Sequence, residues 1–232
     1  MIKIENVVAP STEQWEAIIR GCRNPMNSWG KSDSYYPEEY RYGDLPSDAV
    51  DIGDNDLDLM KRLCSAGTDH RKFMRMITVY ADITAPTFWW AEFDTYKIGT
   101  VRNSCSFMHK GVSRPFTIDD FSIKNKRIDD FQEALVWDRV IEQLNEMRNL
   151  YLETKDNAVF QGIRCLLPSG YMQRSTVMLN YEVLANIYKS RKGHRLDEWK
   201  TMLDWIETLP YSELITGESK DKNETEGEDE ED

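Results

Sequence analysis

Met76–Phe93 reads MITVYADITAPTFWWAEF, and this stretch contains both kinds of secondary structure that decide the fold class. Its first half, Met76–Thr84, is rich in β-branched residues and is typical of a strand. Pro86 then suits the first turn of a helix, where its missing N–H is not needed. Four aromatic side chains follow within residues 88–93. The stretch therefore predicts a strand that leads directly into an aromatic helix.

Outside this stretch the sequence mainly predicts helices. Ser11–Gln14 reads as a capping box that opens a helix with apolar residues at helical spacing. Residues 27–55 are rich in Gly, Pro, Asp and Ser and are expected to form a long surface loop. Helices are predicted over residues 57–64, 129–154, 157–167, 175–190 and 196–209. This order of elements is an α+β pattern rather than an alternating βαβ one.

Composition limits the class of protein. The 232 residues are 40% hydrophobic, so a sizeable core can form. No run of eighteen apolar residues is present, which argues against a transmembrane helix, and residues 1–6 lack the pattern of a signal peptide. We therefore expect a cytoplasmic protein that does not bind membranes. The four cysteines are widely spaced, which favours reduced thiols over a disulfide framework.

The acidic charge is concentrated at the C-terminal end. Residues 217–232 contain nine acids and two lysines, a net charge of −7, out of −12 for the whole chain. They contain no apolar side chain, so we predict a disordered tail after a single domain over residues 1–216. The remaining charge of −5 includes no basic stripe, which argues against nucleic-acid binding.

Several common catalytic signatures are absent from the sequence. It contains no glycine-rich phosphate loop and no G-x-S-x-G elbow. The three histidines, His70, His109 and His194, do not show the spacing of metal ligands, so no metal site is expected. The candidate chemistry therefore depends on less common arrangements of polar residues.

Three polar features stand out along the chain. Arg164 lies at an apolar helix end, where either a bound anion or a structural ion pair would satisfy its charge. Asn180 and Arg191 are eleven residues apart, which places them on nearly one face of a helix, while Asn186 lies on another side. The polar stretch Asn103–Ser106 could hold a phosphate or form a turn.

Taken together, these segments resemble the flavin-dependent thymidylate synthases, over roughly residues 67–210. That family shows an A-R-x-x-L-P block, then an asparagine, a second asparagine six residues later and an arginine five beyond it. Here the block is Ile163–Pro168, and Asn180, Asn186 and Arg191 follow without a gap. The resemblance implies an α+β fold with helices packed on a small, mostly antiparallel sheet.

The upstream part of the resemblance departs from the family pattern. The family signature is R-H-R, a short spacer and S-x-N-E-x-S-x-R. This chain has Thr95–Lys97 in the first part and Asn103–Met108 in the second, with one extra residue between them. Lys97 retains one charge and Ser106 matches the pattern, whereas Ser104 replaces the glutamate. The last arginine is replaced by a methionine.

The resemblance also implies a function. Members of the family are homotetramers that bind FAD at subunit junctions and use NADPH and methylenetetrahydrofolate to methylate dUMP to dTMP. Carried over, Ser104, Ser106 and Arg164 would bind the nucleotide, and Arg191 would orient its pyrimidine as the catalytic arginine. The residues implied for the cofactor are His70, Tyr96, Lys97, Asn103, Asn180 and Asn186. Because the R-H-R contacts are replaced, two alternatives stay open: a pyrimidine-nucleotide-binding protein of the same fold that has lost catalysis, or a related enzyme that modifies another pyrimidine nucleotide.

Overall fold

Strand β2 (Thr78–Pro86) and helix α3 (Thr87–Phe93) follow one another directly, as the sequence predicts. The structure is a computed structural model that describes residues 2–36, 50–123 and 131–217. Burial alternates along the strand, with Val79, Ala81 and Ile83 buried and Tyr80 exposed. This period of two is expected for a strand that has one face in a core. The chain is therefore α+β, as predicted.

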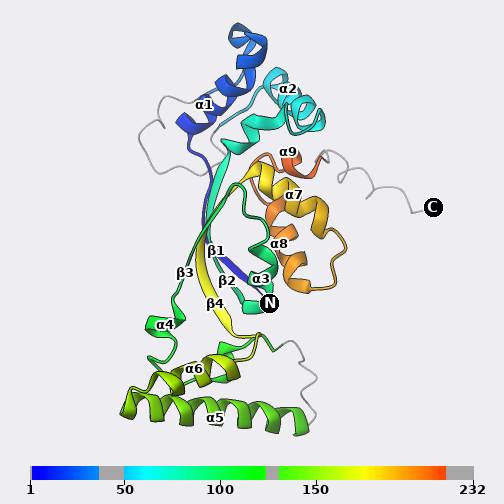
Figure 1. Ribbon diagram of the computed structural model, residues 1–232. Coiled ribbons are helices and arrows are strands. Elements are labelled where there is room, and N and C mark those ends of the chain that lie inside the picture. Colours follow the sequence, from blue (N-terminus) through cyan, green and yellow to red (C-terminus); the bar gives the residue numbers. More distant parts are fainter. Residues whose placement is uncertain (1, 37–49, 124–130, 218–232) are drawn as a thin grey trace, which may run out of the picture. The chain divides into compact units, whose positions relative to one another are not determined.

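The sheet is antiparallel and contains four strands in the order β1-β2-β4-β3 (Figure 1). Beside β2 it contains β1 (Lys3–Val8), β3 (Thr100–Ser104) and β4 (Met172–Asn180). The chain divides into two compact units, and each of the four strands contributes residues to both. Unit 1 comprises Met1–Glu5, Asp82–Thr95 and Arg102–Thr176; unit 2 comprises Asn6–Ala81, Tyr96–Val101 and Val177–Asp232. The single domain predicted over residues 1–216 stays a prediction.

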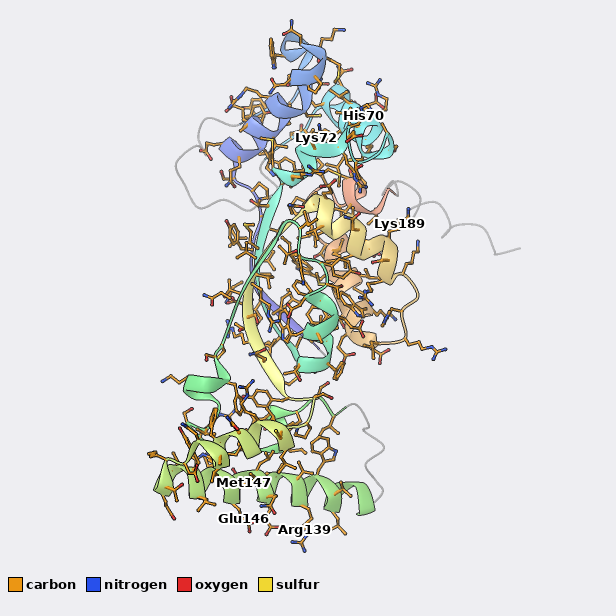
Figure 2. The ribbon with its side chains drawn as sticks, viewed as in Figure 1. His70, Lys72, Arg139, Glu146, Met147 and Lys189 are labelled. Carbon is orange, nitrogen blue, oxygen red and sulfur yellow. The ribbon has the colours of Figure 1, made fainter. Side chains whose placement is uncertain are left out.

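Unit 1 has a core formed by the packing of α5 (Phe131–Thr154) along α6 (Asn157–Leu166). Figure 2 shows Met147 on the side of α5 nearer to α6, with Arg139 and Glu146 on the other side. Gly162 permits this approach, because a Cβ there would lie 2.6 Å from the Cε atom of Met147. The buried side chains of this core are Val112, Phe116, Phe121, Leu144, Phe160 and Ile163.

Unit 1 also contains α3, α4 (Phe107–Lys110) and the 3-10 helix η5 (Ile118–Asp120). The aromatic residues of α3 are held by polar contacts as well as by burial. Trp90 donates its indole N–H to the carbonyl of Gln173 at 2.9 Å, and the guanidinium of Arg102 lies 3.9 Å from the Trp90 ring centroid. A buried tryptophan N–H normally requires such an acceptor.

Unit 2 contains helices from both ends of the chain. They are α1 (Thr12–Arg23), η1 (Asn24–Met26), η2 (Trp29–Lys31), α2 (Asp54–Ser65), η4 (Arg71–Arg75), α7 (Tyr181–Arg191), α8 (Asp197–Glu207) and α9 (Glu213–Thr216). Trp15 is fully buried in their core and makes edge contacts with Tyr181 and Tyr211. The predicted capping box is confirmed, because Ser11 accepts from the Gln14 amide and the Gln14 side chain accepts from the Ser11 amide.

The predicted helix over residues 175–190 is wrong in its first third. Ser175–Asn180 completes strand β4, and the helix begins only at Tyr181. The segment is rich in Ser, Thr and Val, and its burial alternates, with Ser175, Val177 and Leu179 buried. Pairing with β2 and β3 on either side supplies the backbone hydrogen bonds that hold these residues in a strand.

The other predicted helices are confirmed within three residues at each end, where they fall in the described part of the chain. Residues 124–130 and 218–232 lie outside it, so the expected start of the 129–154 helix and most of the predicted acidic tail are not described. Residues 37–49 of the predicted loop over residues 27–55 are likewise not described. The described part of that loop contains η2, and α2 begins at its end. Strands β1 and β3 were not predicted. No helix among the described residues is long and apolar enough to cross a membrane.

Candidate functional site

The predicted site residues divide between the two units. Unit 1 contains Asn103, Ser104, Ser106 and Arg164. Unit 2 contains the remaining six, which are His70, Tyr96, Lys97, Asn180, Asn186 and Arg191. The division separates the predicted phosphate ligands from most of the predicted flavin contacts, so each group is described within its own unit.

In unit 1, Ser106 lines a cavity of about 180 Å³ that also carries two cationic side chains. Ser106 is the residue before α4, and its backbone carbonyl accepts from the amide of Lys110 at 3.1 Å. Lys110 and Arg174 both line the cavity, as does Cys105. A hydroxyl beside two cations is a combination that can bind a phosphate group.

The position of Arg174 is set by an acidic neighbour on the adjacent strand. Its Nη2 atom lies 2.7 Å from a carboxylate oxygen of Asp82, whose other oxygen accepts from the Thr176 hydroxyl at 2.5 Å. The hydrogen bond to Asp82 raises the pKa of Arg174, so the side chain stays cationic at every physiological pH. The contact orients the guanidinium and leaves other N–H groups for a further acceptor.

The remaining predicted residues of unit 1 are solvent-exposed. Ser104 and Asn103 lie at the end of β3 with exposed side chains. Arg164 is also exposed, which corrects the expectation that it lies in an apolar environment. The physical reason is its place on α6: Ile163 points into the core, and the next residue is rotated about 100° away from it. The argument that burial forces Arg164 to find an anion therefore fails.

In unit 2, α7 organises the predicted residues. Arg191, at its last turn, donates from Nε to the hydroxyl of Tyr96 at 2.8 Å, and that hydroxyl also lies 2.6 Å from the Ser190 hydroxyl. The Arg191 guanidinium carbon lies 4.3 Å from the Trp199 ring centroid. Its Nη1 atom lies 3.1 Å from Nε2 of His194. Arg191 is thus fixed by an aromatic pair and a histidine.

At the other end of α7, Asn180 has a structural role. It is the N-cap residue, buried, and its Oδ1 atom accepts from the Val183 amide at 3.0 Å. Asn180 therefore precedes the helix rather than sharing a face of it with Arg191. Gly99, with a φ of +81°, allows a close approach here, because a Cβ would lie 2.4 Å from Nδ2 of Asn180. The capping contact uses the Asn180 oxygen, and Gly99 crowds its amide nitrogen.

His70 and Asn186 are brought into one neighbourhood by Arg71. His70 is exposed immediately before η4, and Arg71 donates to Oδ1 of Asn186 at 3.1 Å. Arg71 and Arg75 also form ion pairs with Glu182. The hydrogen bond from Arg75 lowers the pKa of Glu182, despite its partial burial. Figure 2 shows His70 beside η4 and Lys189 on the neighbouring α7.

Lys97 is exposed in the loop that carries Tyr96, and the next residue, Ile98, is 91% exposed. The loop is therefore anchored at its ends, by Tyr96 against Arg191 and by Gly99 against Asn180, and presents its middle residues outward. An isoleucine so exposed, next to a cation, is available to a bound molecule or to another protein surface.

Sequence reasoning missed several residues that shape these two groups. They are Arg71, Arg75, Lys110, Arg174, Glu182 and Trp199. The contacts of Arg71, Arg75 and Arg174 join segments far apart in sequence. Lys110 lies four residues from Ser106, Trp199 lies eight from Arg191 and Arg71 adjoins His70, so these short spacings offered a signal. In the described part of the chain, no group of three His, Cys, Asp or Glu side chains could hold a metal ion.

The fold is similar to that of two solved structures of thymidylate synthase X from Helicobacter pylori, each with FAD and dUMP. The first has a TM-score of 0.59 at 14% identity and covers 93% of this chain and 95% of that one. The second has a TM-score of 0.58 at 13% identity and covers 93% and 96%. No family model and no curated protein matches the chain. The chain therefore has the fold of the flavin-dependent thymidylate synthases, as its sequence motifs predict.

Proposed function

We propose that this protein is a flavin-dependent enzyme that methylates a pyrimidine nucleotide, converting dUMP to dTMP with methylenetetrahydrofolate and NADPH. The observation that carries the proposal is the Ser106 cavity with its two cations, Lys110 and Arg174. It lies at the residue that the sequence motif assigns to the nucleotide phosphate. The shared fold supports the same assignment.

The cavity supports a specific orientation of the nucleotide. Its volume of about 180 Å³ is too small for a whole nucleotide, since small-molecule pockets typically measure about 300–1,000 Å³. Only the phosphate would enter it, bound by the Ser106 hydroxyl and the two cations. In the proposed complex, Arg191 binds a carbonyl of the pyrimidine and Arg164 adds a charge at the phosphate. The exposed Ser104 is the remaining proposed nucleotide contact.

The chain retains part of the donor set that a flavin dinucleotide needs. His70 and Lys97 are exposed, and Asn186 keeps its Nδ2 donor when Oδ1 accepts from Arg71. These groups fit the phosphates and ring edge of FAD, with Tyr96 and Asn103 as further contacts, whereas Asn180 acts through its cap on α7. Bound FAD would supply the redox chemistry of the reaction. We further propose a homotetramer, with the cofactor enclosed by neighbouring subunits.

A second function is favoured by the contacts of Arg191 and Asn180. Both side chains already have partners within the chain, since Tyr96 accepts from Arg191 and the Val183 amide donates to Asn180. A protein in which such residues have become structural could bind a pyrimidine nucleotide without methylating it. Such a protein would bind the nucleotide phosphate in the Ser106 cavity and would not bind flavin.

Cys105 provides a direct test of the nucleotide assignment. It is exposed and lines the Ser106 cavity, whereas Cys165 is exposed but does not line it. N-ethylmaleimide labelling of the two thiols is measured by peptide mass spectrometry, with and without dUMP. We expect dUMP to slow labelling of Cys105 several-fold and to leave Cys165 unchanged, and deoxyuridine to protect neither. Equal rates at Cys105 with and without dUMP would remove the support for this site.

Turnover separates the two functions. The protein is incubated with FAD, NADPH, methylenetetrahydrofolate and dUMP, and dTMP is measured by mass spectrometry. Formation of dTMP supports the methylase. Protection of Cys105 without any dTMP supports the nucleotide-binding alternative. An Arg191→Ala variant serves as the control, because the proposed reaction requires that guanidinium at the pyrimidine.

A further inference from the structure

A cationic cavity in unit 2 is separate from every residue discussed above. It measures about 700 Å³ and is lined by residues from the end of α1 through η2 and by α2. Three of its lining residues, Arg23, Lys31 and Arg62, are cations, and none of those described is acidic. Leu59 and Leu63 provide an apolar wall. Such a mixture of charge and apolar surface is typical of a site for an anionic organic molecule.

Arg23 is the key residue, because its charge is buried and only partly satisfied. The residue is 4% exposed. Its Nε atom donates to Asp56, and its Nη1 atom makes long contacts of 3.3 and 3.4 Å with the carbonyl and hydroxyl of Ser28. Its Nη2 atom is buried and has no hydrogen-bond partner among the described residues. An unmade hydrogen bond is especially unfavourable on a buried cation.

Asp56 has no oxygen left to accept a hydrogen bond from the Nη2 atom of Arg23. The Asp56 oxygen that does not face Arg23 already accepts from the hydroxyls of Ser32 and Ser34 at 2.7 and 2.6 Å. It also accepts from the amides of Asp33 and Ser34, both at 3.1 Å. Burial alone would raise the pKa of Asp56, but hydrogen bonds from Ser34, Ser32 and Arg23 outweigh it and lower the pKa. Both carboxylate oxygens of Asp56 therefore already accept hydrogen bonds from the chain.

The two outer cations can move toward a ligand. Lys31 is exposed, and Arg62 makes a solvent-exposed ion pair with Asp58 at 3.0 Å. Exposed pairs of this kind contribute little to stability and exchange readily. A bound anion would therefore meet one fixed guanidinium, from Arg23, and two adjustable charges.

We propose that this cavity binds a small molecule that carries a phosphate group, with the phosphate at Arg23 and the apolar part against Leu59 and Leu63. Arginine favours phosphate because its planar fork can donate two parallel hydrogen bonds. The volume exceeds what a free phosphate needs and suits a phosphorylated metabolite. The proposal does not rest on the proposed function, because the cavity contains none of the predicted nucleotide or flavin residues.

The test uses inorganic pyrophosphate as the probe and isothermal titration calorimetry on the full chain, after the Ser106 cavity has been blocked by N-ethylmaleimide labelling of Cys105. The test variant is Lys31→Gln with Arg62→Gln, which leaves the buried Arg23–Asp56 pair intact. The matched control is Lys72→Gln with Arg195→Gln, which removes the same charges from exposed residues outside the cavity. We expect a loss of affinity of about tenfold or more in the test variant and little change in the control.

Two outcomes would overturn the proposal. One is the absence of pyrophosphate binding, or equal binding by the test variant and the wild-type chain. The other is binding that occurs only after residues 218–232 are deleted, which would mean that the chain's own acidic tail occupies the cavity. Protection of Cys105 by dUMP is measured separately, so failure here leaves the proposed function intact, and the reverse also holds.

Discussion

Arg191 donates a 2.8 Å hydrogen bond from Nε to the hydroxyl of Tyr96. The contact joins the residue predicted to bind the pyrimidine to one of the residues predicted to bind the flavin. The two are 95 residues apart in the chain. Trp199 stacks on the same guanidinium, at 4.3 Å, and further restricts it. The tyrosine replaces the central histidine of the family signature, so this chain uses that position to orient its arginine.

Removal of the Arg191 side chain is expected to weaken dUMP binding. Arg191→Ala removes a charged hydrogen bond worth about 1.5–3 kcal/mol, which corresponds to roughly a ten- to hundredfold rise in Kd. Calorimetry on the folded variant measures this change. Arg195→Ala is the control, because Arg195 is exposed and lies four residues further along the chain. An unchanged affinity in Arg191→Ala would mean that the contacts with Tyr96 and Trp199 are purely structural.

FAD is expected to bind weakly and to be lost in part during purification. The two arginines and the histidine of the R-H-R signature are replaced, and each lost charge-assisted contact could cost about 1–3 kcal/mol. Lys97→Arg restores one planar donor at an exposed position. We therefore expect tighter binding in this variant, measured by flavin absorbance after gel filtration. If excess FAD leaves no bound chromophore in either protein, the flavin-dependent function is wrong.

Asp56 is expected to make stability depend on acid pH. Its pKa in the folded state lies below the ordinary value of 3.8, so its contribution is present above that pH and is lost as the pH falls through the folded-state pKa. Asp56→Asn breaks a buried ion pair with Arg23 and should cost about 3–5 kcal/mol at pH 7. Urea unfolding should show that this difference shrinks below pH 3.8.

The control for Asp56 is Asp58, whose exposed pair with Arg62 predicts little effect of Asp58→Asn at any pH. A constant difference between wild type and Asp56→Asn across the acid range would contradict the prediction.

Leu144 tests whether residues 1–216 form a single domain. Its side chain is fully buried in the core of unit 1, so Leu144→Ala should cost about 2–5 kcal/mol. In a single domain, urea unfolding stays one transition and the whole transition shifts. Leu150→Ala is the control on the same helix, because Leu150 is 48% exposed. Two transitions, with only one shifted by Leu144→Ala, would instead identify two domains.

Local signals in the sequence were sufficient for much of the fold. The capping box at Ser11 and the strand-to-helix change at Pro86 were both predicted, because each depends on residues within one or two turns of each other. The end of α6 near Pro168 was predicted for the same reason. The motif from Ile163 to Arg191 also indicated the family fold. The motif can be recognised from the spacing of its residues along the chain, without knowledge of their contacts.

Tertiary structure decided what local pattern could not. Ser175–Asn180 was predicted as the start of a helix, and it is a strand because β2 and β3 lie on either side of it. Arg164 is exposed, because α6 turns Ile163 rather than its neighbour toward the core. Arg191 contacts Tyr96 and Arg23 contacts Asp56, and each of these two partners comes from a segment distant in sequence. Hydrogen bonds and burial between distant segments depend on three-dimensional packing, and residue order alone does not specify them.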